Sequence, residues 1–253
     1  MPTASETRQS RRASLEAQRL AAAAKQRRFR IILVTSGVIV LAVVLVIAII
    51  AIIGAQNKGG ADVPPNANSA KNGIWLKPPT EGAPTLDLFS DYNCTNCKSA
   101  ELVLDAQLDS LTDEGKVNVL VHSMQFEGAT SRIAAVAAAC ADYSGNFADY
   151  NQQLFINQST DGSGFTDTML RETIPANIGI TGSDLTQLQS CIDTTATGNF
   201  VDAQDKYANQ QGVSRTPTFL LDGEDIASKI FNEDTGSYDA DLLRQVVEAA
   251  DGQ

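Results

Sequence analysis

Two cysteines separated by two residues, Cys94 and Cys97, have the residue types and spacing that most directly predict chemistry. Residues 85–89 before them predict a short buried strand, and apolar residues at helical spacing after them predict a helix. On a first helical turn, two Cα atoms three residues apart lie roughly 5–6 Å apart, within disulfide reach. The free N–H groups and partial positive charge of a helix N-terminus also stabilise a thiolate. We therefore expect a redox-active dithiol in which Cys94 ionises more readily than a free cysteine.

Two other interpretations of this cysteine pair are an inert structural disulfide and half of a zinc site. Structural zinc needs four ligands, usually two such pairs or one pair with two histidines. The chain has a single Cys-x-x-Cys and a single histidine, His122. No metal ion or other cofactor is therefore predicted. His122 follows a predicted strand and is interpreted as a surface or hydrogen-bonded side chain instead of a catalytic one.

The charge of the 253-residue chain is unevenly distributed. Its first 30 residues contain eight Lys and Arg against two Asp and Glu, so the remainder contains 11 against 28, a net charge of −17. A domain this acidic is a poor nucleic-acid binder, and no nucleic-acid partner is predicted. The length allows a membrane anchor and one domain of about 180 residues.

Residues 31–53 form a stretch of 23 residues without a charge, which is long enough to cross a bilayer as a helix. The basic residues precede it, so residues 1–30 are predicted to be a cytoplasmic tail and the rest to lie outside, in a single-pass topology. A cleaved signal peptide is the alternative, although its apolar region is usually shorter and no small-x-small cleavage site follows. Residues 54–72 are rich in Gly, Pro, Ala and Asn, which predicts a flexible spacer before a domain of residues 73–253.

The order of elements after the cysteines predicts a parallel sheet with a long insertion. Alternating valines in residues 116–121 indicate a strand, so strand, helix and strand follow one another as in a βαβ unit. Between that strand and Pro217 lie 95 residues, far more than a crossover needs, which predicts an inserted helical subdomain at about residues 124–211. Residues 218–221 predict a further strand that ends at the hairpin turn Asp222-Gly223.

The sequence resembles the thioredoxin superfamily around Cys94 and around Pro217, a residue that belongs at the start of a strand because it cannot donate to a sheet. Residues 88–97 resemble that family's active-site loop, and residues 212–219 resemble its cis-proline loop. Segments in the insertion resemble the DsbA-like branch: residues 135–141, 145–150 and 154–158. Over roughly residues 73–250, the resemblance implies an α/β thioredoxin fold with an inserted helical subdomain. One N-terminal transmembrane helix would precede it.

The resemblance also implies a function and roles for four residues. Cys94 would be the nucleophile that forms a mixed disulfide, Cys97 would resolve it, and Thr216 and Pro217 would border the substrate groove. The chain would be a membrane-anchored, extracytoplasmic oxidase of oxidative protein folding, introducing disulfides into reduced secreted or surface proteins. A quinone-linked membrane protein would re-oxidise it, and a monomer is expected. The alternatives are a disulfide reductase or isomerase, and a non-catalytic, chaperone-like binding module tethered to the membrane.

The two remaining cysteines, Cys140 and Cys191, each lie on the apolar face of a predicted helix. They would pair if their Cα atoms come within about 7 Å, or remain two separate buried thiols. A second, structural disulfide is a habit of the family in this region, so the resemblance implies a Cys140–Cys191 bond.

The active-site stretch departs from many family members at three positions. Thr95 and Asn96 replace a proline and an aromatic residue or histidine, and neither is charged. A buried acid often lies beneath the family's cysteines, but Leu88 stands at one expected position here. Its neighbour Asp87 is on the opposite strand face and is either that acid or a solvated carboxylate.

Overall fold

The structure, a computed structural model, describes residues 63–159 and 161–251. The predicted cytoplasmic tail (1–30), the predicted transmembrane helix (31–53) and the first part of the predicted spacer (54–62 of 54–72) lie outside the described residues. Within the ranges that are described, no helix is both long and apolar enough to cross a bilayer.

A five-stranded sheet with the order β1-β3-β2-β4-β5 forms the centre of the fold. Its strands are β1 (Ile74–Trp75), β2 (Thr85–Ser90), β3 (Asn118–Ser123), β4 (Thr218–Leu221) and β5 (Glu224–Asp225). Strands β2 and β3 run parallel and are joined by helix α2 (Thr95–Asp113), so the predicted βαβ unit is confirmed. Strand β4 runs antiparallel to β2 on its other side, which places the residues just before β4 beside the residues just after β2.

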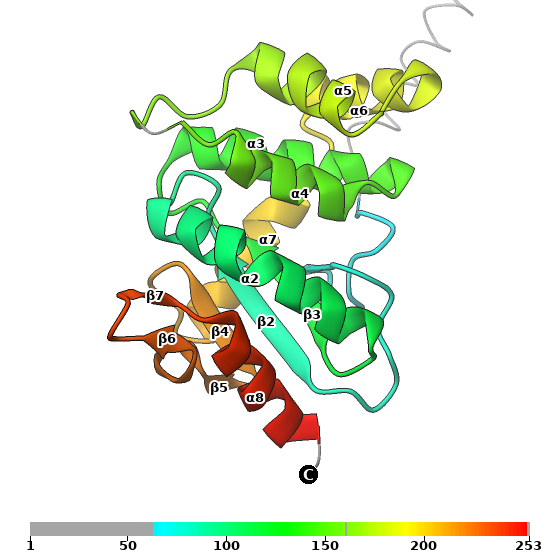
Figure 1. The fold of residues 1–253 in the computed structure, drawn as a ribbon. Helices are drawn as coiled ribbons and strands as arrows, with labels where there is room; N and C mark the ends of the chain where they lie inside the picture. Colours follow the sequence, from blue (N-terminus) through cyan, green and yellow to red (C-terminus); the bar gives the residue numbers. More distant parts are fainter. Residues whose placement is uncertain (1–62, 160, 252–253) are drawn as a thin grey trace, which may run out of the picture. The chain divides into compact units, whose positions relative to one another are not determined.

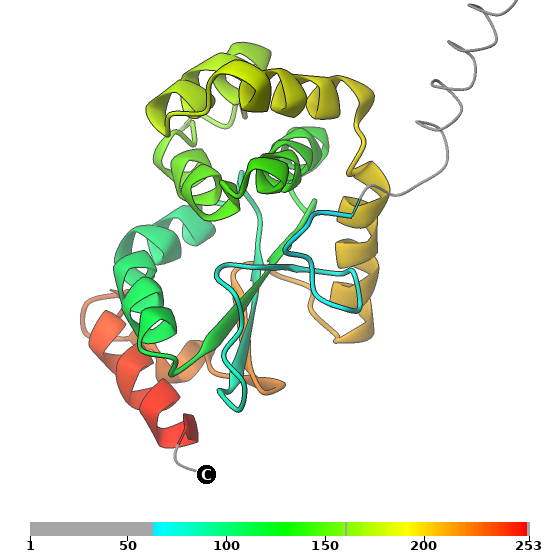
Figure 2. The same ribbon diagram turned by 90° about the vertical axis from the view of Figure 1, so that its right-hand side faces the viewer.

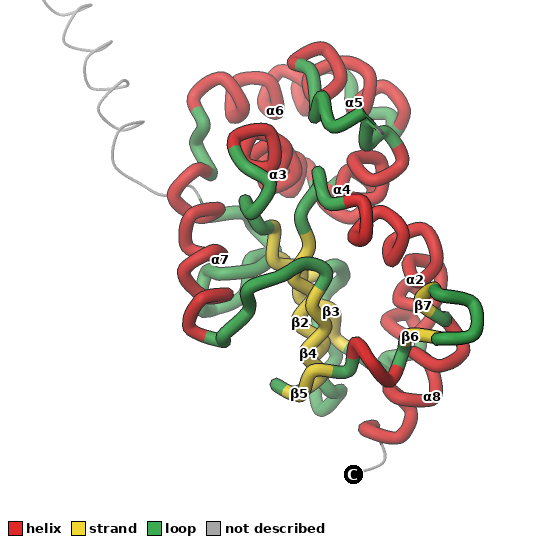
Figure 3. Tube along the Cα trace, turned by 90° about the vertical axis from the view of Figure 1, so that its left-hand side faces the viewer, coloured by secondary structure: helices red, strands yellow, loops and turns green. Residues whose placement is uncertain are grey.

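Helices cover both faces of this sheet (Figures 2 and 3). Helices α2 and α8 (Ala240–Asp251) lie on one face, and α7 (Gly198–Gln210) lies on the other. Because side chains of a strand alternate between faces, Leu88 of β2 belongs to the core under α2, whereas Phe89 belongs to a smaller cluster under α7. The larger core therefore lies directly beneath the Cys-x-x-Cys helix.

The predicted helical insertion is confirmed between β3 and β4. Figure 1 shows its first helices stacked beyond one end of the sheet, next to the N-terminal end of α2. The elements are α3 (Ala129–Ala141), η1 (Asp142–Ser144), α4 (Phe147–Ile156), the π-helix η2 (Met169–Thr173), α5 (Ile174–Asn177) and α6 (Gly182–Thr194). Helix α3 packs against both α4 and α6, and α4 packs against α2, so the insertion is joined to the active-site helix through α4.

A disulfide joins Cys140 of α3 to Cys191 of α6, with their Cα atoms 5.8 Å apart. Both residues are buried in the core of the insertion. The bond closes a loop of 51 positions within the insertion, and it is distant in sequence from Cys94 and Cys97.

Replacing Cys140 and Cys191 together by alanine should lower the melting temperature by roughly 8–16 °C. The reason is that a loop of this length restricts the unfolded chain, by on the order of 4 kcal/mol in the chain-entropy model. Thermal unfolding of the full-length chain, followed by circular dichroism, measures the effect. The matched control replaces Cys94 and Cys97 by alanine and should leave most of the melting temperature intact. Free thiols at positions 140 and 191 in the non-reduced protein would contradict the assignment.

The structure corrects the predicted end of the spacer. The backbone N–H of Asn66 donates to Oδ2 of Asp142 at 2.7 Å, and its side-chain amide donates to Oδ1 at 2.8 Å. Ala67 forms a β-bridge with Ile74. Residues 63–72 therefore belong to the folded domain, because Asn66 donates hydrogen bonds to the buried carboxylate of Asp142. Composition alone does not reveal this contact.

The chain between β4 and α8 begins with the predicted hairpin turn and continues with structure that was not predicted. Asp222 and Gly223 have φ angles of 48° and 87°, as a type I′ turn requires of both central residues. After β5, the short helix η3 (Ala227–Lys229) leads to a small hairpin of β6 (Phe231–Asn232) and β7 (Ser237–Tyr238). This hairpin lines a recess together with Pro217.

Candidate active site

Cys94 and Cys97 lie where the strand-to-helix spacing predicts. Cys94 is the N-cap of α2, and Cys97 lies in the first turn. Both thiols are free and largely buried: Cys94 is 8% exposed and Cys97 is 1% exposed. Cys94 is thus the more accessible of the two sulfurs, although less exposed than a surface nucleophile.

The two stretches predicted to form the site, one around Cys94 and one around Pro217, come together at Cys94. The peptide bond between Thr216 and Pro217 is cis. The Cys94 Sγ lies 3.5 Å from the carbonyl oxygen of Thr216. The antiparallel pairing of β2 with β4 brings these residues together across 122 positions of sequence. All four residues predicted for catalysis and substrate binding therefore form one site.

The two sulfurs have opposite acidities. A hydrogen bond from the Cys97 thiol, together with backbone N–H groups of Cys97 and Asn96, lowers the pKa of Cys94 to about 6 against the opposing effect of burial. Burial and the neighbouring Cys94 raise the pKa of Cys97 above its ordinary value. At neutral pH, Cys94 is therefore a thiolate and Cys97 is a thiol, which is the state required of a nucleophile and a resolving residue.

Gln158, at the end of α4, fixes the active-site loop to the insertion. Its buried side-chain amide donates to the carbonyl of Tyr92 at 2.6 Å and to the carbonyl of Cys94 at 3.0 Å. In return, its backbone carbonyl accepts from Nζ of Lys98 at 3.0 Å. The backbone on both sides of the nucleophile is thereby held by a residue that is distant in sequence.

Asp91 holds the other side of the same loop. Its carboxylate is fully buried and accepts from the backbone N–H of Asn93 at 2.8 Å and of Glu127 at 3.0 Å. Its own backbone N–H points to the Cys97 Sγ at 3.5 Å. Asp91 therefore connects the turn before the helix, the loop before α3 and the buried sulfur.

A buried acid lies beneath the cysteines, and it is Glu101. Its side chain lies on α2, and together with Cys97 and Pro217 it lines a small cavity of about 10 Å³, roughly the space of one water molecule. Burial, and secondarily the charge of Asp105, raises the pKa of Glu101 to about 8, although a bond from Asn151 opposes the shift. At neutral pH, Glu101 is therefore mostly protonated and can exchange a proton with its surroundings.

A hydrogen-bonded chain connects Glu101 to the insertion and the sheet. The side-chain amide of Asn151 donates to Oε1 of Glu101 at 2.7 Å, and the hydroxyl of Tyr92 donates to Oδ1 of Asn151 at 2.9 Å. The same hydroxyl lies 3.2 Å from Oγ of Ser123. Burial also raises the pKa of Tyr92, so this residue is a neutral hydrogen-bonding partner.

Asp87 is not the acid beneath the cysteines. Its Oδ1 lies 2.7 Å from Nε2 of His122, on the sheet face that α7 covers. Nδ1 of the same ring lies 2.6 Å from the carbonyl of Asn72, and the ring stacks on Phe89 with centroids 4.4 Å apart. His122 is fully buried, so the hydrogen-bonded interpretation describes it and the surface interpretation does not.

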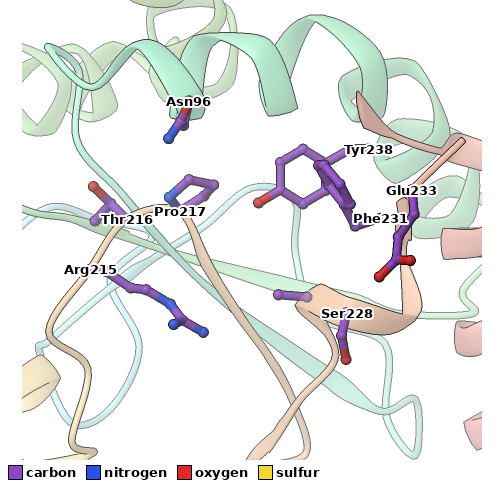
Figure 4. A pocket seen from close by; sticks show the side chains of 9 residues that line it. Asn96, Arg215, Thr216, Pro217, Ser228, Phe231, Glu233 and Tyr238 are labelled. Carbon is purple, nitrogen blue, oxygen red and sulfur yellow. The ribbon is translucent and has the colours of Figure 1, made fainter. Parts of the chain in front are cut away.

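Two recesses open on either side of the Thr216 backbone. One, of about 370 Å³, is lined by Cys94 and by Phe126 of the loop before α3. The other, of about 310 Å³, lies beside Pro217 and reaches the β6–β7 hairpin at Tyr238 (Figure 4). Thr216 borders both, so an extended polypeptide that passes the Cys94 sulfur has space on both sides of it.

Sequence comparison assigns the chain to a family. A family model described as Thioredoxin matches residues 80–238, which is more than half of the chain and includes both cysteines and the Thr216–Pro217 loop. The chain belongs to this thioredoxin family. No curated protein matches the sequence.

Solved structures share the fold and its helical insertion. BdbD from Bacillus subtilis, in its oxidised form, has a TM-score of 0.61 and 20% identity, over 76% of this chain and 100% of that one. MdbA from Actinomyces oris, a thiol-disulfide oxidoreductase, has a TM-score of 0.60 and 16% identity, over 76% and 93%. MdbA from Corynebacterium diphtheriae, also a thiol-disulfide oxidoreductase, has a TM-score of 0.55 and 16% identity, over 65% and 88%. At these identities, the likeness establishes the shared fold.

Proposed function

We propose that this protein is a DsbA-like thiol-disulfide oxidoreductase that acts as an oxidase on reduced proteins. The observation that carries the proposal is the opposite acidity of Cys94 and Cys97 beside the Thr216 carbonyl. A stabilised Cys94 thiolate favours the reduced form of the pair, and a pair that favours its reduced form is a strong oxidant of other thiols. The fold shared with two proteins described as thiol-disulfide oxidoreductases supports the same class.

The reaction begins with the pair oxidised. A substrate thiolate attacks the Cys94 Sγ, the Cys94–Cys97 bond breaks, and Cys97 leaves with the electron pair. A second substrate thiolate then attacks the substrate sulfur of the mixed disulfide. The new substrate disulfide forms, and Cys94 leaves as a thiolate. The substrate loses two electrons, and the dithiol gains them.

The departing Cys97 needs a proton, because its buried sulfur disfavours a negative charge. Glu101 lines the same small cavity and is mostly protonated at neutral pH. We assign it as the donor of that proton. When the dithiol is re-oxidised, the same carboxylate accepts the proton from the Cys97 thiol.

An oxidase of this kind must return to its disulfide form. We propose a quinone-linked membrane protein as the electron acceptor. Residues 31–53 anchor this chain in the same membrane as that protein, and the catalytic domain lies on the extracytoplasmic side. The basic residues before residue 31 support this orientation.

Protease added to intact cells should therefore digest the domain and spare residues 1–30. Protection of the domain in those cells would contradict the orientation.

The first test separates an enzyme from a non-catalytic binding module. In the reduced full-length chain, the rate of Cys94 alkylation by iodoacetamide should rise with pH and reach half of its maximum near pH 6, because only the thiolate reacts. Mass spectrometry identifies the modified cysteine and gives the rate. The matched control is the Cys94→Ser variant, which should show little modification at pH 6. Half-maximal reaction near pH 8.5 would contradict the thiolate assignment.

A reductase or isomerase would use the same cysteines with a different potential. The pKa of Cys94 favours the oxidase, because a stable thiolate makes the pair easier to reduce. The equilibrium potential of the Cys94–Cys97 pair distinguishes these functions.

A further inference from the structure

The recess beside Pro217 has an aromatic wall. Phe231 of β6 and Tyr238 of β7 pack edge to face with centroids 5.5 Å apart, and the Phe231 side chain is well exposed. Figure 4 shows the Tyr238 hydroxyl pointing toward Pro217, with the Phe231 ring beside it. Aromatic faces bind both apolar chains and cations, so the wall alone does not define what the recess binds.

The charges around the recess favour a cation. Arg215 lies at one side and pairs with Asp225 at 3.6 Å, and Lys229 pairs with Glu224 at 2.7 Å. Glu233 lines the opposite side (Figure 4), and among the described residues it makes no salt bridge or side-chain hydrogen bond. The recess therefore combines aromatic rings with one carboxylate whose charge is not compensated.

The surrounding chain strengthens this negative character. Residues 215–241 contain two Lys and Arg against seven Asp and Glu, a net charge of −5. Charges of one sign around a recess raise the local concentration of groups of the opposite sign and speed their association. A basic segment is therefore drawn to this side of the site more strongly than an acidic one.

The recess is close to the reacting sulfur. Asn96, Arg215 and Thr216 line both this recess and the one that contains Cys94. A polypeptide whose cysteine reaches Cys94 thus places a residue near its cysteine into the recess. The volume of about 310 Å³ accommodates one long side chain.

On these observations, we propose that the recess selects substrates with a lysine or arginine side chain close to the reacting cysteine. The aliphatic stem lies along Phe231, the cationic group lies over the aromatic rings, and its charge is met by Glu233. The inference rests on the proposed oxidase function and specifies the substrates that react fastest.

The test uses short peptides with one cysteine and one variable residue, placed at each of the two positions on either side of the cysteine. The variable residue is lysine, norleucine or glutamate, so that norleucine keeps the stem of lysine without its charge. The oxidised full-length chain is mixed with each peptide, the reaction is quenched with acid, and mass spectrometry measures mixed disulfide and reduced chain.

At low salt, we expect at least one lysine peptide to react about tenfold faster than its norleucine counterpart, with the glutamate peptide slowest. Glu233→Gln should remove most of the preference for lysine over norleucine, and Glu233→Lys should make the glutamate peptide the fastest. The matched control Glu81→Gln removes one carboxylate at the opposite end of β2 and should leave the lysine preference intact. The preference should also shrink as salt is raised.

Three results would overturn the inference while leaving the proposed function intact. Equal rates for lysine and norleucine at every position would mean that the aromatic wall binds apolar side chains only. A lysine preference that Glu233→Gln leaves undiminished would assign the selection to the general acidity of the surface. If the glutamate peptide reacts fastest with the unaltered chain, the selection of substrates would be assigned to Arg215. Failure to form a mixed disulfide with any peptide would instead overturn the proposed function, and this inference with it.

Discussion

Replacing Cys94 by serine should abolish disulfide transfer to reduced proteins. A serine hydroxyl cannot form the mixed disulfide, and the remaining Cys97 is buried and has a raised pKa. Transfer is measured as the loss of free thiols in a reduced, unfolded protein that is mixed with the oxidised chain. The Cys140→Ala/Cys191→Ala variant serves as the control, because it leaves the reacting pair in place.

Replacing Cys97 by serine should have a different result. The Cys94 thiolate can still attack a disulfide in an oxidised substrate protein, and one substrate sulfur then leaves as a thiolate. No Cys97 thiol remains to displace the substrate from Cys94, so covalent adducts should accumulate and be visible on non-reducing gels. Cys94 should also lose part of its acidity, because the Cys97 thiol is the largest contributor to its lowered pKa. Adducts with Cys94→Ser and none with Cys97→Ser would reverse the assigned roles.

Replacing Glu101 by glutamine should slow disulfide transfer and stabilise the fold. The rate should fall on the order of 100-fold at pH 7, because the buried Cys97 loses its proton donor and acceptor. Stability should rise because the folded state raises the pKa of this carboxyl from 4.5 to about 8. Ionisation is therefore easier in the unfolded chain, and at pH 7 this linkage opposes folding by on the order of 3 kcal/mol.

The stability gained by Glu101→Gln should depend on pH. Below about pH 4 the carboxyl is protonated in both states, so Glu101→Gln should change stability little there. The gain should grow as pH rises from 4.5 and level off above about pH 8. Urea unfolding at several pH values measures it, with Asp109→Asn as a control on the same helix, where the carboxylate is about half exposed. If Glu101→Gln transfers disulfides as fast as the unaltered chain, Glu101 is not the proton donor to Cys97.

The reacting groups were predictable because they depend on local spacing. Cys94 and Cys97 lie at a strand-to-helix junction, and Pro217 precedes a strand, so their positions follow from short stretches of sequence. Their proximity was predicted only through the resemblance to the thioredoxin superfamily, because the spacing alone does not show that β4 pairs with β2.

Glu101 was missed although the sequence contains a signal for it. It follows Cys97 by four residues and lies in the apolar stripe of α2, which also contains Ala100 and Leu104. A carboxylate in such a stripe must be buried, and a position one turn after Cys97 places it beneath that sulfur.

Other parts of the site depend on packing between distant segments. Gln158 reaches the Cys94 carbonyl only because α4 packs on α2. Asp87 was ambiguous because the partner that engages it, His122, lies on a neighbouring strand. Neither contact has a local pattern that would identify it.

The equilibrium potential of the Cys94–Cys97 pair tests the central claim most directly. The full-length chain is equilibrated in glutathione buffers of known ratio, and the fraction of reduced pair is measured by acid quenching and mass spectrometry. The lowered pKa of Cys94 predicts a potential more oxidising than the roughly −270 mV of thioredoxin, shifted toward the roughly −120 mV of DsbA. A value near or below −270 mV would contradict the account and identify the protein as a reductase.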